Sequence, residues 1–144
     1  MTADLPSDIR RAGLRVTRGR LEVLRLLEDA PHSDAESIHT RLRAVDPDAS
    51  IQSVHNVLSA LTGAGLVRRI EPAKSAARYE RRVGDNHHHV VCTGCGAIED
   101  VDCVVGHAPC LAPSSTSGFR IDTAEVTFWG LCAACAPPGG PIAA

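Results

Sequence analysis

Two cysteine pairs with the same spacing constrain the fold of this chain most. Cys92 and Cys95 form one Cys-x-x-Cys motif, and Cys132 and Cys135 form a second one much further along the chain. Four such thiolates make the tetrahedral ligand set of a structural zinc ion. Free buried cysteines or a redox dithiol are the alternatives, but a thioredoxin-type site needs only one pair. The favoured interpretation is a zinc ion that ties the segment before Cys132 back to the segment around Cys92.

The length and the N-terminus favour a small cytoplasmic protein in which the cysteines bind metal. The 144 residues suffice for one ordinary domain or two small ones. The first residues lack both the basic and the apolar region of a secretory signal, which argues against a secreted disulfide framework. No apolar run approaches the roughly 20 residues of a membrane-spanning helix, so no membrane association is expected.

Charge divides the chain into two unlike halves. Residues 1–82 contain 14 Lys or Arg and 11 Asp or Glu, whereas residues 83–144 contain one Arg and six acidic residues. A basic N-terminal half followed by an acidic half rich in metal ligands is typical of nucleic-acid binding joined to metal binding. Chance scatter of solvated charges is the alternative.

The N-terminal half predicts a winged helix-turn-helix. Thr17 can cap a helix whose apolar positions, including Leu21, Leu24 and Leu27, follow helical spacing. Ser33 and Glu36 fit a capping box that opens a second helix. Ser50 can cap a third, which would be the recognition helix. Two short strands, in residues 66–70 and 78–80, would form the wing. A plain helical bundle with a hairpin is the alternative.

The C-terminal half predicts an α/β domain. Strands are expected over residues 87–92, 97–101 and 119–129, and a short helix over residues 103–111. The predicted organisation is a winged-helix domain in residues 1–82, a hinge in 83–85, an α/β domain in 86–136 and a flexible tail in 137–144. The fold class is therefore α+β.

The histidine run before the first cysteine pair predicts a second metal site. On a strand, His87 and His89 project from one face and His88 from the other. Acidic residues near the run are Glu80, Glu99, Asp100 and Asp102. Imidazole with carboxylate suits divalent iron, manganese or zinc. A solvated polar edge is the alternative.

Cys103 and Cys110 lie seven residues apart and are interpreted as small apolar residues on one helix face. A redox pair or an additional metal ligand remains an alternative for them. No catalytic motif is present. Zinc deaminases need His-x-Glu and Pro-Cys-x-x-Cys, but Val91 and Leu131 occupy the Glu and Pro positions. The chain is therefore not expected to be an enzyme.

From about residue 8 to residue 135 the chain resembles the ferric uptake regulator (Fur) superfamily of metal-dependent dimeric repressors. The matching segments are Gly13-Leu14-Arg15-Val16-Thr17 with Arg20, Ala30-Pro31-His32, Ser53-Val54-His55-Asn56-Val57-Leu58, Gly65-Leu66-Val67, Arg78-Tyr79-Glu80, the histidine run with its cysteine pair, and Gly130-Leu131-Cys132-Ala133-Ala134-Cys135. The stretch from Val101 to Cys110 is similar to the actinobacterial FurA/CatR branch, whose members regulate catalase-peroxidase and other oxidative-stress genes.

The resemblance implies three metal sites and a DNA-binding surface. The structural zinc falls on Cys92, Cys95, Cys132 and Cys135, and the C-terminal domain is expected to dimerise. The regulatory site falls on His32, Glu80, His87, His89 and Asp100. A third site keeps two family ligands, and its set here is His88, His107, Asp122 and Glu125. The expected DNA-contacting residues are Arg15, Arg18, Arg20, Gln52, Ser53, His55 and Asn56.

The expected function is a cytoplasmic, homodimeric, metal-dependent repressor that binds A·T-rich palindromic operators. Structural Zn²⁺ and regulatory Fe²⁺ or Mn²⁺ are the expected metals, and Zn²⁺ is an alternative at the regulatory site in vitro. In peroxide-sensing relatives, peroxide oxidises a histidine at the positions of His32 or His87. Glu80, however, matches iron-uptake regulators, so an iron- or zinc-uptake regulator without peroxide sensing is an alternative. A thiol redox or metal-storage protein is an alternative from another class.

Overall fold

The computed structural model describes residues 4–139, and its contacts divide the chain into two compact units that meet between Val83 and Gly84. This boundary falls inside the segment that the sequence assigns to a hinge. Within the described residues, no helix combines the length and the apolar character needed to cross a membrane.

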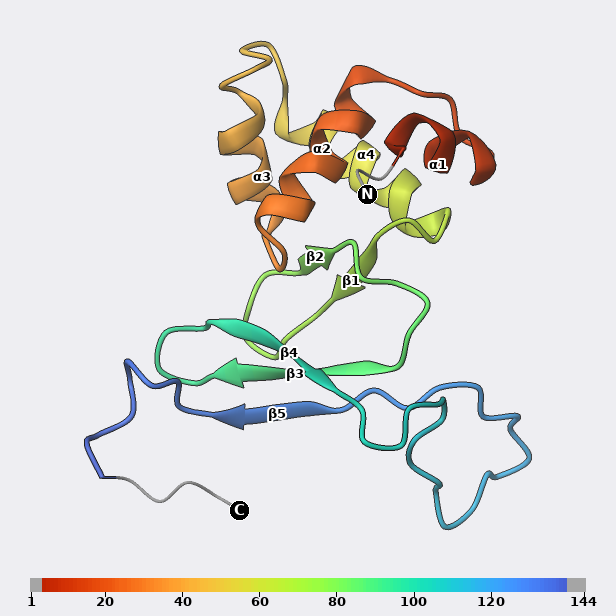
Figure 1. Cartoon of the computed structure of the whole chain (residues 1–144), viewed down its shortest axis with the longest axis vertical. Coiled ribbons are helices and arrows are strands. Elements are labelled where there is room, and N and C mark those ends of the chain that lie inside the picture. The colour runs from red at the N-terminus through yellow and green to blue at the C-terminus, as the bar shows by residue number, and fades with distance from the viewer. Residues whose placement is uncertain (1–3, 140–144) are drawn as a thin grey trace. The chain divides into compact units, whose positions relative to one another are not determined.

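The first unit contains four helices and a hairpin (Figure 1). The helices are α1 (Leu5–Arg11), α2 (Arg18–Asp29), α3 (Ala35–Leu42) and α4 (Ile51–Gly63). Strands β1 (Arg68–Ile70) and β2 (Arg78–Glu80) pair antiparallel. This order is that of the predicted winged helix-turn-helix, with α1 added in front of it.

Side-chain caps fix where the helices begin. Thr17 Oγ1 accepts the N–H of Arg20 at 3.3 Å, and Ser50 Oγ accepts the N–H of Ser53 at 3.1 Å, so both predicted caps are confirmed. The predicted Ser33 cap of α3 is wrong. Asp34 caps that helix by accepting the N–H of Ser37 at 2.8 Å, whereas the Ser33 hydroxyl donates to the Ala30 carbonyl. A carboxylate accepts an amide hydrogen bond more strongly than a hydroxyl does, which favours a start one residue later.

The helices of the first unit enclose one apolar core. Its fully buried members come from every helix: Ile9, Val23, Leu24, Leu27, Ile38, Val54, Leu58 and Leu61. Burial of one such side chain contributes roughly 1.5–3 kcal/mol. The core therefore holds α4 in place while the exposed Gln52, Ser53, His55 and Asn56 leave its outer face polar.

The second unit is built on a three-stranded sheet with the order β4-β3-β5 (Figure 1). The central strand β3 (His87–Cys92) pairs antiparallel with β4 (Ile98–Asp102) and parallel with β5 (Thr127–Gly130). His89 lies opposite Asp100 on one side and opposite Thr127 on the other. Because β3 is central, its backbone is hydrogen-bonded on both edges.

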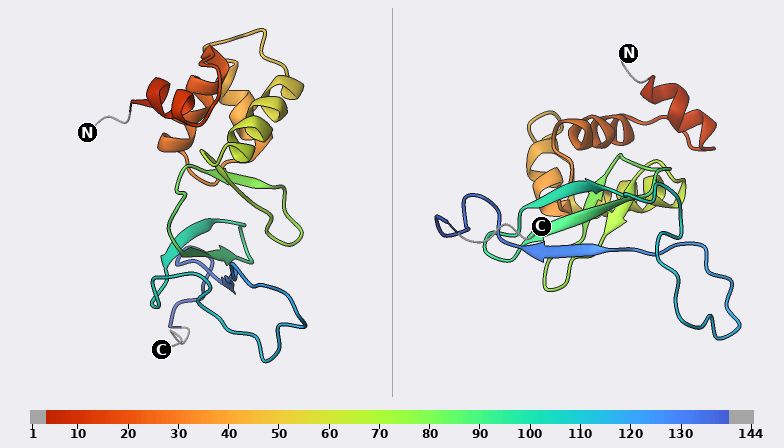
Figure 2. Two further views of the ribbon diagram at one scale, coloured as in Figure 1. Left: turned by 90° about the vertical axis from the view of Figure 1, so that its right-hand side faces the viewer. Right: turned by 60° about the horizontal axis from the view of Figure 1, so that its bottom comes forward.

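The connection from β4 to β5 differs from the sequence prediction. The expected helix over residues 103–111 is absent, and residues 103–126 run without helix or strand in the long excursion visible in Figures 1 and 2. Gly106 adopts a φ of +77°, and Pro109 lacks a backbone N–H, so neither continues a helix. The expected strand over residues 119–129 shortens to β5, because only His89–Cys92 of β3 pair with it.

The predicted flexible tail, residues 137–144, lies largely outside the described residues. Residues 137–139 belong to neither a helix nor a strand.

Candidate metal centres and nucleic-acid interface

The four cysteines of the two Cys-x-x-Cys motifs meet in the second unit. Cys92 ends β3 and Cys95 lies in the turn that follows, whereas the turn after β5 presents Cys132 and Cys135. All four sulfur atoms lie within 4.8 Å of one another, and Cys95 Sγ is 3.8 Å from Cys132 Sγ. Zn–S bonds of 2.3 Å in a tetrahedron place sulfurs about 3.8 Å apart. The donor set and its spacing therefore fit a structural zinc ion.

Backbone groups prepare this cluster for a cation. The N–H of Cys132 donates to Cys92 Sγ at 3.3 Å, and with the N–H groups of Cys95 and Gly94 it lowers the pKa of Cys92 to about 6. The neighbouring sulfurs of Cys132, Cys92 and Cys95 raise the pKa of Cys135 to about 12. The site thus favours one thiolate but disfavours the last one until a cation balances the charge.

Gly94 allows the two turns to approach each other. A Cβ atom added at this position would lie 3.1 Å from both Cβ and Sγ of Cys135. The sequence suggests a turn at Gly94, but the close approach to the second cysteine pair becomes visible only in the structure.

One imidazole–carboxylate pair is assembled within the first unit. His32 Nε2 lies 3.0 Å from Glu80 Oε2, and the Glu80 side chain is 1% exposed. His32 has a φ of +64°, a left-handed conformation in which His is enriched among non-glycine residues. Its N–H donates to the Tyr79 carbonyl, and the Tyr79 N–H donates to the Ser33 carbonyl, so β2 holds the histidine in this conformation.

A second group of ligands is assembled within the second unit. His87 and His89 project from the same face of β3, with ring centroids 4.9 Å apart. Asp100 on β4 reaches both, with Oδ1 3.7 Å from His87 Nε2 and 3.4 Å from His89 Nε2. Both imidazoles are buried. This face of the sheet therefore offers two nitrogens and a carboxylate to a divalent cation.

Asp85 contacts a candidate metal ligand, and the sequence prediction missed it. Its Oδ1 lies 2.6 Å from His87 Nδ1, the ring nitrogen opposite the one that faces Asp100. A carboxylate at Nδ1 holds the proton there and leaves Nε2 as the metal-binding nitrogen. The signal in the sequence is an acidic residue two positions before a histidine that opens a strand.

His88 faces away from His87 and His89, as the strand alternation predicts, but it lies next to cysteines. Cys110 Sγ is 3.2 Å from His88 Nε2, and Cys103 completes a cluster with both. His107, Asp122 and Glu125 are in none of the described groups whose ligand atoms lie within reach of one ion. The third site with those residues stays a prediction.

The predicted DNA-contacting residues lie on the surface of the first unit. Gln52 and Asn56 are exposed one turn apart on α4, and Gln52 Nε2 donates to Asn56 Oδ1 at 3.0 Å. Arg15 is exposed, whereas the Arg18 guanidinium donates to the Val45 carbonyl and that of Arg20 to the Arg15 carbonyl. Arg18 thus contacts the loop between α3 and α4, and Arg20 contacts the loop before α2.

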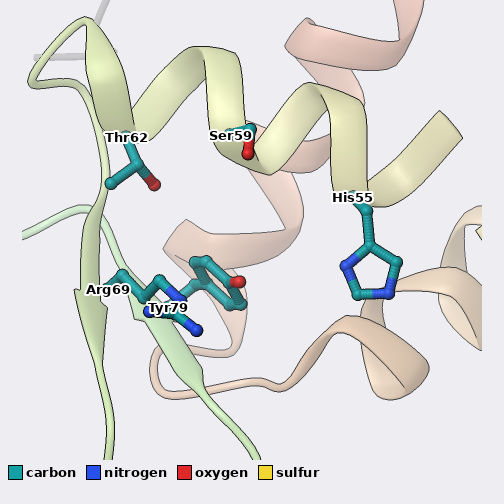
Figure 3. Close-up of a pocket in the computed structure, with 5 residues that line it drawn as sticks. All are labelled: His55, Ser59, Thr62, Arg69 and Tyr79. Atoms are coloured by element: carbon teal, nitrogen blue, oxygen red, sulfur yellow. The ribbon is translucent and has the colours of Figure 1, made fainter. Parts of the chain in front are cut away.

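A polar pocket of about 340 Å³ adjoins this surface between α4 and the hairpin (Figure 3). Its lining residues are His55, Ser59, Thr62, Arg69 and Tyr79. A hydrogen bond with the Tyr79 side chain raises the pKa of Arg69, and Glu71 adds to the shift. The pocket therefore presents a fixed cation beside the helix that carries His55.

Comparisons with known proteins agree with this architecture. Residues 11–128 match the model of the ferric uptake regulator family. The chain belongs to the ferric uptake regulator family. It is 56% identical to the transcriptional regulator FurA of Mycobacterium tuberculosis over 132 residues, which cover 92% of this chain and 90% of that protein. The family match spans both units, and the protein is a Fur-family transcriptional regulator.

Solved Fur structures share the fold at much lower sequence identity. The Vibrio cholerae ferric uptake regulator superposes with a TM-score of 0.70 at 22% identity, covering 90% of this chain and 100% of that one. The Helicobacter pylori regulator, described as having three functional metal-binding sites, gives 0.69 at 23% identity, covering 94% and 91%. At this identity the likeness establishes the fold alone.

Proposed function

We propose that this protein is a homodimeric, metal-dependent DNA-binding repressor that controls oxidative-stress genes, including a catalase-peroxidase gene. The Fur-family match over both units carries the proposal. The winged helix would read an A·T-rich palindromic operator through Arg15, Gln52, Ser53, His55 and Asn56, while Arg18 and Arg20 contact phosphates.

Structural Zn²⁺ would occupy Cys92, Cys95, Cys132 and Cys135 and hold the end of β5 against the end of β3. A regulatory Fe²⁺ or Mn²⁺ would take His32 and Glu80 from the first unit and His87, His89 and Asp100 from the second. The support for this set is that each unit separately arranges its own ligands: the 3.0 Å His32–Glu80 pair in one, and Asp100 beside two buried imidazoles in the other.

One regulatory ion would be coordinated by ligands from both units at the same time. If the ion binds the arrangement of the units that fits DNA more tightly than it binds other arrangements, it shifts the population toward the DNA-binding arrangement. The size of this shift is limited by the difference between the ion's affinities for the arrangements. The hinge at residues 83–85 would be the element that moves. Loss of the ion, or peroxide oxidation of His32 or His87, would then release DNA.

DNA binding is tested with the zinc-loaded full chain and its own promoter. A gel shift should appear with Mn²⁺ and weaken when a chelator removes it. The Glu99→Gln variant should give the same metal-dependent shift as wild type, because this exposed carboxylate neighbours Asp100 but lies outside the proposed ligand set. No shift with or without metal would overturn the repressor proposal.

Peroxide sensing is tested by intact-mass and peptide mass spectrometry after exposure of the Fe²⁺-loaded protein to peroxide. One added oxygen on His32 or His87 supports direct sensing. An unmodified protein that keeps DNA bound favours the alternative of an iron- or zinc-uptake regulator.

A further inference from the structure

The side of β3 opposite His87 and His89 carries a cluster that the regulatory and structural sites leave unused. His88 is buried on this side, and Cys103 and Cys110 approach it from the connection between β4 and β5. One imidazole nitrogen and two sulfurs all lie within 4.8 Å of one another. We propose that His88, Cys103 and Cys110 form a separate site for a thiophilic d¹⁰ cation, Zn²⁺ or Cu⁺.

The distances match the dimensions of such a site. Zn–S and Zn–N bonds of about 2.3 and 2.0–2.1 Å at a tetrahedral angle separate the sulfur from the nitrogen by about 3.6 Å. Cys110 Sγ and His88 Nε2 are 3.2 Å apart, so a displacement of a few tenths of an ångström admits the ion. Three protein ligands complete a trigonal Cu⁺ site, or leave a fourth zinc position for water.

The loop is fixed in a way that suits thiolate ligation. Backbone N–H groups of Gly106 and Val105 donate to Cys103 Sγ, as N–H groups do to Cys92 in the four-cysteine site. Asn86 Nδ2 donates to the His107 carbonyl at 2.8 Å and ties the loop to the start of β3. N–H donors around a sulfur stabilise its charged form.

The ligand chemistry separates this cluster from the regulatory set. Two sulfurs favour thiophilic ions, whereas imidazole with carboxylate suits Fe²⁺ and Mn²⁺. The cluster also differs from the third site expected from the sequence, which shares His88 but otherwise uses His107, Asp122 and Glu125. In the proposed site, two thiols take the place of those partners.

Metal content tests the proposal on the reduced full chain. After reconstitution with Zn²⁺ and dialysis, wild type should hold one more thiophilic ion per chain than Cys110→Ser, which keeps the four-cysteine zinc. His88→Gln should lose the same ion, and His107→Gln, the matched control, should retain it. A parallel Cu⁺ titration against bicinchoninate shows which ion binds more tightly.

Cobalt substitution counts the sulfur ligands. A second Co²⁺ should add thiolate charge-transfer absorbance about half as strong as that of the four-cysteine site, and Cys103→Ser should lower it. Equal metal content in wild type and Cys110→Ser overturns the proposal, as does loss of the ion in His107→Gln. Protein that is purified under reducing conditions and still contains a Cys103–Cys110 disulfide and no additional ion overturns it in favour of a thiol switch.

Discussion

At the scale of single residues, Asp85 lies outside the proposed ligand set but contacts one of its members. Its 2.6 Å contact at His87 Nδ1 fixes the ring and directs Nε2 toward Asp100. Side chains that orient metal ligands typically contribute 10- to 100-fold to metal affinity.

Replacing Asp85 by Asn should therefore weaken Mn²⁺ binding about tenfold or more while leaving zinc in place. Isothermal titration of the zinc-loaded protein measures the change. Glu99→Gln removes an exposed carboxylate outside the proposed ligand sets and should leave the affinity unchanged. An unchanged Mn²⁺ affinity in the Asp85 variant would contradict the orienting role.

The pKa values at the four-cysteine site predict how many protons zinc displaces. Because the pKa of Cys92 is lowered to about 6, this thiol is mostly ionised at pH 7.5 in the metal-free protein. The pKa of Cys135 is raised to about 12, so this thiol keeps its proton until zinc binds. Zinc uptake at pH 7.5 should then release fewer than four protons, because thiolates are the binding form.

A pH-indicator dye in weak buffer measures this release. The folded-state pKa of Cys92 lies below the 9.0 of an ordinary thiol, so its ionised form stabilises the fold above pH 9 and this contribution disappears as pH falls through about 6. The stability of the metal-free protein should therefore fall as pH decreases through about 6. Release of four protons at pH 7.5 would show that Cys92 is protonated and would contradict the assignment.

At the scale of elements, strand β3 contributes ligands to each candidate metal site of the second unit. Its alternation sends His87 and His89 to one side and His88 to the other, and its end delivers Cys92. This much follows from the sequence, because a period of two residues is the geometry of any strand. The residues that contact each face of β3 come from distant parts of the chain, and the local sequence pattern does not identify them.

The loop after β4 shows where prediction from sequence ends. The seven-residue spacing of Cys103 and Cys110 fits a helix face, but Gly106 at positive φ and Pro109 exclude that helix. The thiols instead meet His88, a contact that no local pattern encodes. Likewise, Ser33 fits a capping box, yet the carboxylate of Asp34 caps α3.

Gly94 tests the packing of the two cysteine turns. Gly94→Ala should place a methyl group 3.1 Å from Cys135 and force the turns apart, lowering stability by about 1–3 kcal/mol and speeding zinc loss to a chelator. Gly130→Ala is the matched control, since no atom lies within 4 Å of its added Cβ. Chemical denaturation and chelator kinetics compare them, and equal behaviour of the two variants would contradict the close packing.

At the scale of the whole molecule, the sequence already separates two units of opposite charge, and the fold divides within the predicted hinge, between Val83 and Gly84. The winged helix and the sheet domain follow from periodicity, caps and cysteine spacing. The first helix, Leu5–Arg11, was missed because the prediction began at Thr17. Asp4 caps it, and its hydrogen bonds with Ser7 lower the pKa of that carboxyl.

At the scale of the whole molecule we propose that one regulatory ion binds ligands of both units and thereby controls DNA binding. The most direct test is a Mn²⁺ titration of operator binding, followed by fluorescence anisotropy, with zinc-loaded wild type, Glu80→Gln, His89→Gln and the control Glu99→Gln. Each ligand variant should raise the Mn²⁺ midpoint at least about tenfold, since a direct ligand contributes no less than an orienting residue. Glu99→Gln should titrate like wild type, and all variants should keep their zinc. Operator binding that does not depend on Mn²⁺, or a Mn²⁺ midpoint that shifts in only one of the two ligand variants, would contradict a regulatory ion shared by both units.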